Sequence, residues 1–347
     1  MDLKSKRIAI LSPVAWRTPP RAYGAWETVA SNIAEGLIAR GWENVTLFAT
    51  KDSITQARLE GVIERGYERD KSQMPPVSAC LHIAHCMEQA GRFDLIHNNF
   101  DYLPLTYSRL IGAPILTTIH GFSEPGILPV YRRYDNTYFV SISDADRDPG
   151  LSYLATVYNG IDISNITFRK KAGDKLVSFG RIHPDKGVHL AIEVAQRSGM
   201  DLLIAGIIQD QGYFDSKIRP YLNDSTIQYI GPVNPTARDA LLKEAYTVLH
   251  LNTIPERFGL VMAESMAAGT PVIAMDLGSC REVIADKVTG YLVDSVERAV
   301  AAVGVIGKID RGKCRQRVEE NFTIDCMVAG YEKVYEEIFK REKLKKR

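Results

Sequence analysis

The sequence has few of the features that mark a secreted or membrane-spanning chain. Its 347 residues include five scattered cysteines, an odd number that favours reduced thiols over a disulfide framework. No apolar run approaches the roughly 18 residues that a membrane span requires. Residues 1–7 are charged and lead straight into an apolar segment, so no signal peptide is expected. These absences predict a cytoplasmic protein.

A strong charge of either sign is also absent. The formal net charge is +1, so there is no electrostatic case for binding nucleic acid. Hydrophobic residues make up 45% of the chain and charged residues 24%, which is typical of a globular protein. The length is enough for two domains of ordinary size, while the oligomeric state cannot be predicted.

Two common phosphate-binding patterns are missing as well. The first apolar segment, Arg7–Pro13, is not followed by Gly-x-Gly-x-x-Gly, which gives a nicotinamide or flavin cofactor little support. The later loop Gly180–Gly187 is not a P-loop, because no glycine precedes Lys186 and no serine or threonine follows it. We therefore expect no cofactor.

What the sequence does contain is an alternation of apolar strands and amphipathic helices. Arg7–Pro13 predicts a buried parallel strand, Glu27–Arg40 a helix, and Asn44–Ala49 the next strand. The same alternation resumes at Lys175–Phe179 and continues to about Val293. It predicts an α/β protein made of two Rossmann-like domains, each with a doubly wound parallel sheet.

The expected domain boundaries follow from shifts in composition. We predict a first domain at residues 1–165, a second at 166–325, and a final helix in 326–347. The polar and basic stretch 164–174 is interpreted as a linker between them. The last residues, 340–347, are mostly basic and are expected to be a solvated tail. The alternative is a weak peripheral contact with anionic lipid.

The most informative stretch is Pro255–Ile273. It predicts a loop that carries Glu256, a helix from about Leu260 that carries Glu264, and then a buried strand. A carboxylate on an apolar helix needs partners, and the paired hydroxyls of a sugar or ribose suit it. The alternative is that Glu256 is a solvated loop residue and that Glu264 pairs with a buried basic residue.

This stretch closely resembles the retaining, nucleotide-sugar-dependent glycosyltransferases of family 4. The resemblance lies in the Glu-x7-Glu spacing, the Phe-Gly-Leu-Val segment inside it, and the Met-Ala-x-Gly-x-Pro-Val-Ile ending. It implies the GT-B fold, in which two Rossmann-like domains face each other across a cleft. It also implies that the final helix packs back toward the N-terminal domain.

The resemblance assigns roles to this stretch residue by residue. Glu264 is expected to bind the ribose hydroxyls of the donor, and Glu256 is expected to bind hydroxyls of the transferred sugar. Backbone N–H groups should contribute at four consecutive positions: the first two should bind the same sugar, and the last three should help to hold the diphosphate, since a helix N-terminus favours an anion. These positions are Phe258, Gly259, Leu260 and Val261.

The loop Gly180–Gly187 supplies the expected cations. Arg181 and Lys186 lie just before a predicted helix, and they match the Gly-Arg-x4-Lys-Gly pattern that binds the donor diphosphate in the family. Bond breakage develops negative charge on this leaving group, and fixed cations stabilise that charge. We therefore expect no essential metal. The alternative is that both side chains simply face solvent.

Other candidates depend more on the resemblance. His120 ends a strand where the family places a histidine facing the donor sugar, and we expect it to position the sugar rather than to act as the nucleophile. Gly24 matches the first glycine of the family's Gly-Gly-x-Glu turn, although Ala25 replaces the second. Gly206 and Val233 lie in loops after strands, where they could seat the nucleobase by backbone contacts or be plain turns.

Two further segments are weaker candidates. Ser279 and Arg281 lie in a loop that resembles the one near the distal phosphate or sugar. Four soft ligands occur within Cys80–Cys86, but structural zinc normally recruits two separated ligand pairs, so these are interpreted as helix-packing residues.

The predicted function is that of a metal-independent, retaining hexosyltransferase. It would use a UDP-glucose-type donor and a saccharide or lipid-linked saccharide acceptor, in the synthesis of a polysaccharide or glycoconjugate. The alternatives are a GT-B relative with epimerase or hydrolase chemistry, and a protein that binds nucleotide sugars without catalysis.

Overall fold

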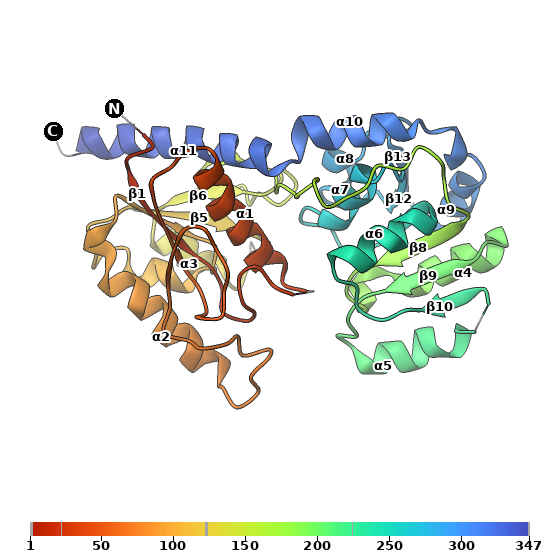
Figure 1. The fold of residues 1–347 in the computed structure, drawn as a ribbon, viewed down its shortest axis with the longest axis horizontal. Helices are drawn as coiled ribbons and strands as arrows, with labels where there is room; N and C mark the ends of the chain where they lie inside the picture. The colour runs from red at the N-terminus through yellow and green to blue at the C-terminus, as the bar shows by residue number, and fades with distance from the viewer. Residues whose placement is uncertain (1–2, 22, 122–123, 224, 346–347) are drawn as a thin grey trace. The chain divides into compact units, whose positions relative to one another are not determined.

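A computed structural model describes residues 3–21, 23–121, 124–223 and 225–345 of the chain. The chain divides into two compact units (Figure 1). The first unit contains residues 1–160 together with 324–347, and the second contains residues 161–323. Each unit is built on its own sheet of parallel strands. The expected α/β class with two parallel-sheet domains is therefore confirmed.

The sheet of the first unit has seven strands in the order β3-β2-β1-β4-β5-β6-β7. Its central strands are buried on both faces, which is why they appear in the sequence as continuous apolar runs. The strands are β1 Arg7–Leu11, β2 Asn44–Phe48, β3 Arg58–Glu60, β4 Leu95–Asn98, β5 Ile115–Ile119, β6 Tyr138–Ser141 and β7 Tyr153–Thr156.

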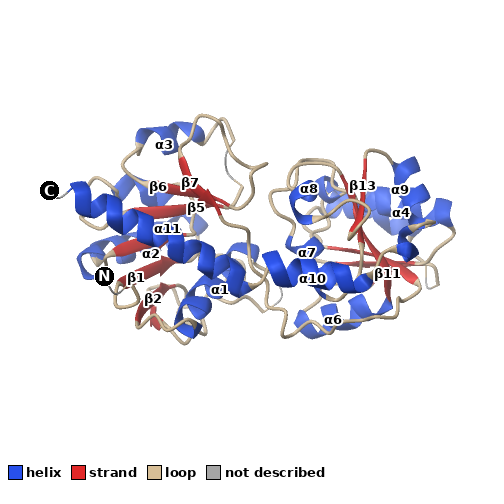
Figure 2. Cartoon of the chain, turned by 90° about the horizontal axis from the view of Figure 1, so that it is seen from above, coloured by secondary structure: helices blue, strands red, loops and turns tan. Residues whose placement is uncertain are grey.

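Helices cover both faces of this sheet. They are α1 Ala25–Ala39, α2 Pro75–Glu88, α3 Leu128–Arg133 and α11 Ile324–Lys345, with short 3₁₀ turns η1 Ala90–Arg92 and η2 Leu103–Tyr107. The last helix, α11, lies beside α1 on one face (Figure 2). The two helices approach closely at Gly36, where a Cβ atom would lie 2.5 Å from Val328. The α2 helix packs on the opposite face.

A buried chain of polar groups joins α11 to the sheet. His97 on β4 bonds through Nδ1 to the Tyr335 hydroxyl at 2.7 Å and through Nε2 to the Thr118 hydroxyl at 2.8 Å. The Thr118 hydroxyl in turn lies 2.8 Å from the Tyr331 hydroxyl. Burial lowers the pKa of His97 to about 3, so the imidazole is neutral. These bonds fix the register of α11 on the sheet.

The sheet of the second unit has six strands in the order β10-β9-β8-β11-β12-β13. The strands are β8 Lys175–Phe179, β9 Leu202–Ala205, β10 Ile227–Tyr229, β11 Ala245–His250, β12 Val272–Met275 and β13 Gly290–Val293. The α-helices are α4 Val188–Ser198, α5 Gln211–Tyr213, α6 Pro235–Glu244, α7 Leu260–Ala267, α8 Cys280–Val283, α9 Val296–Val303 and α10 Arg311–Asn321. The other helical segments are the 3₁₀ turns η3 Pro184–Lys186, η5 Arg219–Tyr221 and η6 Ile306–Lys308, and the π-helical turn η4 Phe214–Ile218.

The stretch 164–174 is not a free linker, and that prediction is wrong. The backbone N–H of Thr167 donates to Asp239 at 2.7 Å, and Arg169 forms an ion pair with the same carboxylate at 3.1 Å. The buried Arg311 donates to the Arg169 carbonyl at 2.8 Å. The polar residues that suggest a flexible connection therefore bind the second unit.

Across the part of the chain that the structure describes, no helix combines the length and apolar character needed to cross a bilayer. The longest helix, α11, has 22 residues but carries charged side chains along its length.

Candidate active site

The polar residues of the second unit gather at the carboxyl ends of β8 and β11. Lys186 ends the η3 turn that follows β8, and Glu256 lies in the loop that follows β11. Because neighbouring parallel strands end at the same edge of a sheet, these loops converge. The Lys186 ammonium lies 2.6 Å from Oε2 of Glu256. The structure thus brings together two of the residues that the sequence singles out.

Glu256 has more partners than the sequence predicts. Its Oε2 atom also accepts hydrogen bonds from His250 Nε2 at 2.9 Å and from Asn252 Nδ2 at 2.6 Å. Its Oε1 atom accepts from the backbone N–H of Arg257 at 3.0 Å. Glu256 is buried, so the alternative of a solvated loop residue is wrong.

The charge of Glu256 is stabilised by these neighbours. Burial by itself would raise the pKa of this carboxyl, but the His250 hydrogen bond and the Lys186 charge outweigh it. The pKa of Glu256 is held well below its usual value, so the site contains a carboxylate next to an ammonium.

The backbone of Glu256 is also fixed, by the loop after β12. Its N–H donates to the Leu277 carbonyl at 3.4 Å, and its carbonyl accepts from the Ser279 N–H at 2.9 Å. Gly278, between these two residues, has a φ of 62°, and a Cβ atom there would lie 2.2 Å from the Glu256 carbonyl oxygen. Glycine is required at this position both for its φ and for the close approach.

Arg181 bonds to a residue outside this cluster. Its Nη1 donates to the side chain of Gln209, and its backbone follows Gly180, which contacts Gly206. A Cβ atom at Gly206 would lie 1.5 Å from the Gly180 carbonyl oxygen, so close packing alone is enough to require glycine at this position. The expected contacts of Arg181 and Gly206 with a donor stay predictions, as does that of the half-exposed Val233.

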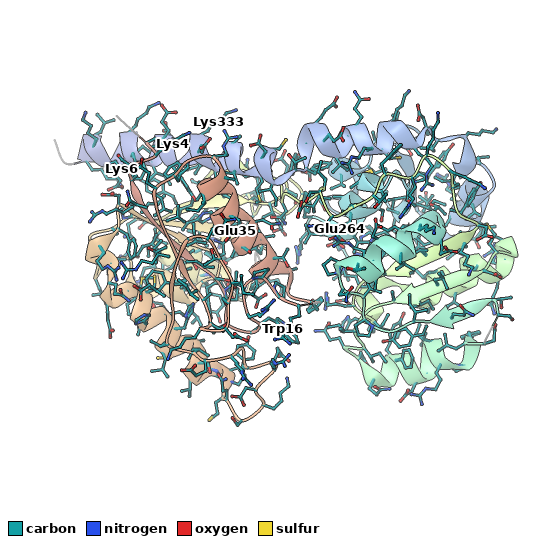
Figure 3. The ribbon with its side chains drawn as sticks, in the orientation of Figure 1. Lys4, Lys6, Trp16, Glu35, Glu264 and Lys333 are labelled. Carbon is teal, nitrogen blue, oxygen red and sulfur yellow. The ribbon has the colours of Figure 1, made fainter. Side chains whose placement is uncertain are left out.

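Glu264 has a basic partner, as the alternative interpretation of the sequence expects. Arg238 on α6 donates from Nη1 to Oε1 of Glu264 on α7 (Figure 3 labels Glu264). Burial raises the pKa of Glu264, and the Arg238 charge opposes that shift. Hydroxyl binding by Glu264 stays a prediction, and Arg238 is a neighbour that the spacing does not indicate.

The segment before α7 is anchored by a buried aromatic side chain. Phe258 is 2% exposed and packs edge-on against Phe322, with ring centroids 5.7 Å apart. Gly259 caps α7 with a φ of 82°, so Leu260 and Val261 form the first turn. The N–H groups of a first turn have no intrahelical acceptors, which keeps the predicted anion contact chemically reasonable.

Ser279 and Arg281 have partners within the second unit. The backbone of Ser279 holds Glu256, and Arg281 forms an ion pair with Asp276 at 2.6 Å. Ligand contacts by either side chain stay predictions.

In the first unit, His120 lies just after β5 and is neutral. Burial lowers the pKa of its imidazole to about 3. Its Nε2 atom donates to Oδ1 of Asn99 at 3.0 Å, which leaves Nδ1 as the acceptor nitrogen. Trp26 stacks on the ring, with centroids 5.7 Å apart. Asn99, which the sequence analysis misses, therefore selects the tautomer of His120.

The turn that contains Gly24 begins α1. Gly24 is the N-cap with a φ of 145°, and Glu27 in the first helical turn is buried. Oε1 of Glu27 accepts the backbone N–H of Trp16 at 3.1 Å, which ties the loop after β1 to the helix (Figure 3 labels Trp16). Burial raises the pKa of Glu27 from 4.5 to about 7.

This shift predicts a pH-dependent stability of the first unit. The folded state keeps the Glu27 proton to a higher pH than the unfolded state. The contribution of protonated Glu27 to the free energy of unfolding is therefore fully present below about pH 4.5. Roughly 3 kcal/mol of it is lost as the pH rises through about 7. The variant Glu27→Gln should lose this slope. All three tryptophans, Trp16, Trp26 and Trp42, belong to the first unit, so fluorescence-detected denaturation at pH 5 and pH 8 measures the effect.

The matched control is the exposed Glu43, whose replacement by Gln should leave the slope unchanged. Equal slopes for the parent and Glu27→Gln would contradict the prediction.

The cysteine and histidine residues of α2 do not form a metal centre. His82 and Cys86 are buried, and His82 Nε2 bonds the Ser12 carbonyl at 2.9 Å. Cys80 is exposed, so only part of this set packs the helix on the sheet. Outside the few residues that are not described, no group of three or more potential ligands is placed to hold a metal ion.

The metal-free prediction also assumes that the chain contains no Asp-x-Asp pattern, and that assumption is wrong, because Asp144-Ala145-Asp146 lies just after β6. Asp144 accepts a hydrogen bond from Thr156, and Asp146 is buried. Independence from metal stays a prediction.

The two parallel-sheet units define the fold class of the protein. Their architecture matches the GT-B glycosyltransferase structures, which confirms the expected fold. Residues 162–323, nearly all of the second unit, match the family model of "Glycosyl transferases group 1". The chain thus contains a group 1 glycosyltransferase domain of the GT-B type, and the Lys186–Glu256 cluster lies inside it.

Known proteins resemble the chain over most of its length. Glycogen synthase of Mycobacterium tuberculosis is 26% identical over 361 aligned positions, which cover 88% of this chain and 87% of that protein. The structure of sucrose-phosphate synthase from Thermosynechococcus elongatus matches with a TM-score of 0.80 at 18% identity, covering 97% of this chain and 100% of that one. Anabaena HepE in complex with UDP-glucose matches with a TM-score of 0.73 at 18% identity, covering 96% and 100%.

Proposed function

We propose that this protein is a retaining glycosyltransferase of family 4. It transfers a hexose from a nucleotide-diphosphate sugar, with UDP-glucose as the favoured donor, to a saccharide or lipid-linked saccharide acceptor. The observation that carries the proposal is the ion pair of Lys186 with the buried Glu256 at the carboxyl edge of the sheet, inside the residues that match the group 1 model. The complex of Anabaena HepE with UDP-glucose supports the choice of donor.

The chemistry follows from the charges of the site. Lys186 uses one of its three N–H donors on Glu256, so two remain for phosphate oxygens. Arg181 adds a planar fork that grips phosphate in two places. Together they neutralise the negative charge that develops on the departing diphosphate. The leaving phosphate then receives the proton of the acceptor hydroxyl on the same face of the sugar.

The remaining roles concern recognition. Glu264 accepts hydrogen bonds from the ribose hydroxyls while Arg238 holds its other oxygen. Glu256 accepts from a hydroxyl of the transferred sugar. Such contacts discriminate sharply, because a donor without the hydroxyl leaves a buried polar group unpaired. His120 keeps the positioning role that the resemblance gives it.

A panel of nucleotide sugars tests the proposal. The purified protein should be stabilised against heat by one donor class, release its nucleotide, and pass the sugar to an added saccharide or lipid-linked acceptor with the anomeric configuration kept. Release of free sugar in the presence of every acceptor would favour the hydrolase alternative. Conversion of the donor to an isomer would favour the epimerase, and binding without turnover would favour a non-catalytic protein.

The metal-free mechanism makes a separate prediction. Turnover should persist in excess chelator, because Arg181 and Lys186 supply the positive charge at the leaving group. Parallel assays with added magnesium, manganese or zinc are the control. A complete loss of turnover that one metal restores would contradict the prediction, and Asp144 and Asp146 would then be the first ligands to replace.

We also propose a cytoplasmic location, where nucleotide sugars are made. The basic residues near the end of α11 are treated as solvated, with weak attraction to anionic lipid as the alternative.

A further inference from the structure

Three donors from three places in the second unit converge on a single oxygen. Oε2 of Glu256 accepts from Lys186 at 2.6 Å, from His250 at 2.9 Å and from Asn252 at 2.6 Å. A carboxylate oxygen offers only about two lone-pair directions, so Oε2 is fully occupied. Oε1, which accepts the backbone N–H of Arg257, retains capacity for one more donor.

The donors His250 and Asn252 are themselves held by the fold. His250 is the last residue of β11 and is 6% exposed, and Asn252 is 1% exposed in the loop that follows. Because a carboxylate only accepts hydrogen bonds, the hydrogen must lie on Nε2 of His250, and the amide nitrogen of Asn252 must face Glu256. Neither side chain can turn away without leaving a buried charge short of a partner.

Asn252 is poorly explained by packing alone. Its Oδ1 atom is buried and has no hydrogen-bond partner among the described residues. An unpaired buried acceptor destabilises the folded state, whereas the N–H of the same amide stabilises the buried Glu256 carboxylate. Packing therefore does not account for an amide at this position, whereas its hydrogen bond to Glu256 does.

We propose that His250 and Asn252 are positioning residues for sugar transfer. They hold Oε2 of Glu256 against Lys186, so that the ammonium is aimed at the diphosphate and Oε1 is presented to a hydroxyl of the donor sugar. This inference rests on the proposed function, since it assigns the two residues to the same site. Neither residue touches the reacting atoms; both act through Glu256 and Lys186.

The test compares variants that remove the donor with one that keeps it. His250→Leu and Asn252→Leu should each lower kcat with UDP-glucose about 10²-fold, since a misplacement of about 1 Å costs that much. His250→Gln, which retains an N–H donor, should recover most of the loss. The affinity for uridine alone, measured by calorimetry, should change by less than about threefold, because uridine lacks both the diphosphate that Lys186 faces and the sugar that Glu256 contacts.

Stability separates positioning from a structural role. Asn252→Leu removes the unpaired acceptor together with the donor, so its midpoint of thermal unfolding should shift by no more than about 3 °C. The matched control is Val303→Ala, at the buried last residue of α9. This change should lower the midpoint of thermal unfolding while leaving kcat at the parental value.

The outcomes are distinct. If the parent is active and both His250→Leu and Asn252→Leu keep the parental kcat, this inference alone is overturned. It is also overturned if the loss of kcat only parallels the fall in the midpoint of thermal unfolding and His250→Gln does not recover it. A parent that turns over no nucleotide sugar overturns the proposed function and this inference with it.

Discussion

Replacement of Lys186 by methionine is expected to lower kcat about 10²- to 10³-fold. Methionine keeps the length of the side chain but removes the charge that we propose faces the leaving diphosphate, and loss of one preorganised donor typically costs that much. The change also leaves the Glu256 carboxylate with His250 and Asn252 but without its ammonium partner. Steady-state kinetics with the donor that the panel identifies measures the effect.

Two further variants make this result specific. Lys217→Met makes the same chemical change at an exposed position of the same unit and should leave turnover unchanged. The double variant Lys186→Met with Glu256→Gln should fold more stably than Lys186→Met alone, because removing both partners avoids a buried unpaired charge. Parental turnover by Lys186→Met would contradict the proposed role of Lys186 in neutralising the charge on the departing diphosphate.

The variant Gly278→Ala should lower the free energy of unfolding of the second unit by about 3 kcal/mol and abolish turnover. About 1 kcal/mol comes from the φ of 62°, and the rest from a methyl group 2.2 Å from the Glu256 carbonyl oxygen. Relief of that overlap must move the backbone of Glu256 and hence its carboxylate. Calorimetry and kinetics measure the two losses.

Gly199→Ala is a close control for that experiment. Gly199 ends α4 with a φ of 68°, but a Cβ atom there would meet nothing within 4 Å. Gly199→Ala should therefore lower the free energy of unfolding by only about 1 kcal/mol and leave turnover intact. The tryptophan signal of the first unit should be unaffected by either change. Equal losses for Gly199→Ala and Gly278→Ala would show that the backbone contact with Glu256 does not matter.

Much of the fold can be predicted from the sequence, because buried parallel strands and the helices between them leave strong periodic patterns. Lys175–Phe179 is bounded in the structure as the pattern predicts, and the strands expected at Arg7–Pro13 and Asn44–Ala49 end within two residues of the predicted bounds. The stretch 164–174 shows the limit of such reasoning. Its polarity resembles that of a linker, but the partners Asp239 and Arg311 are distant in sequence.

The site is only partly predictable for the same reason. The two charged motifs identify Lys186 and Glu256, yet nothing in their spacing reveals that they bond to each other across 70 residues. His250 and Asn252 lie close before Glu256, and the only available signal is their polarity at the end of an apolar strand. Arg238 and Asn99 carry no such signal, since their roles depend on partners brought near by the sheet.

The discontinuity of the first unit has a consequence for biosynthesis. Tyr331 and Tyr335 leave the ribosome only after all 163 residues of the second unit, 161–323, have been made. Until then His97 and Thr118 lack the hydroxyls that satisfy them, and the sheet face beneath α11 is bare. The first unit therefore stays incomplete while the second unit is synthesised between its two pieces.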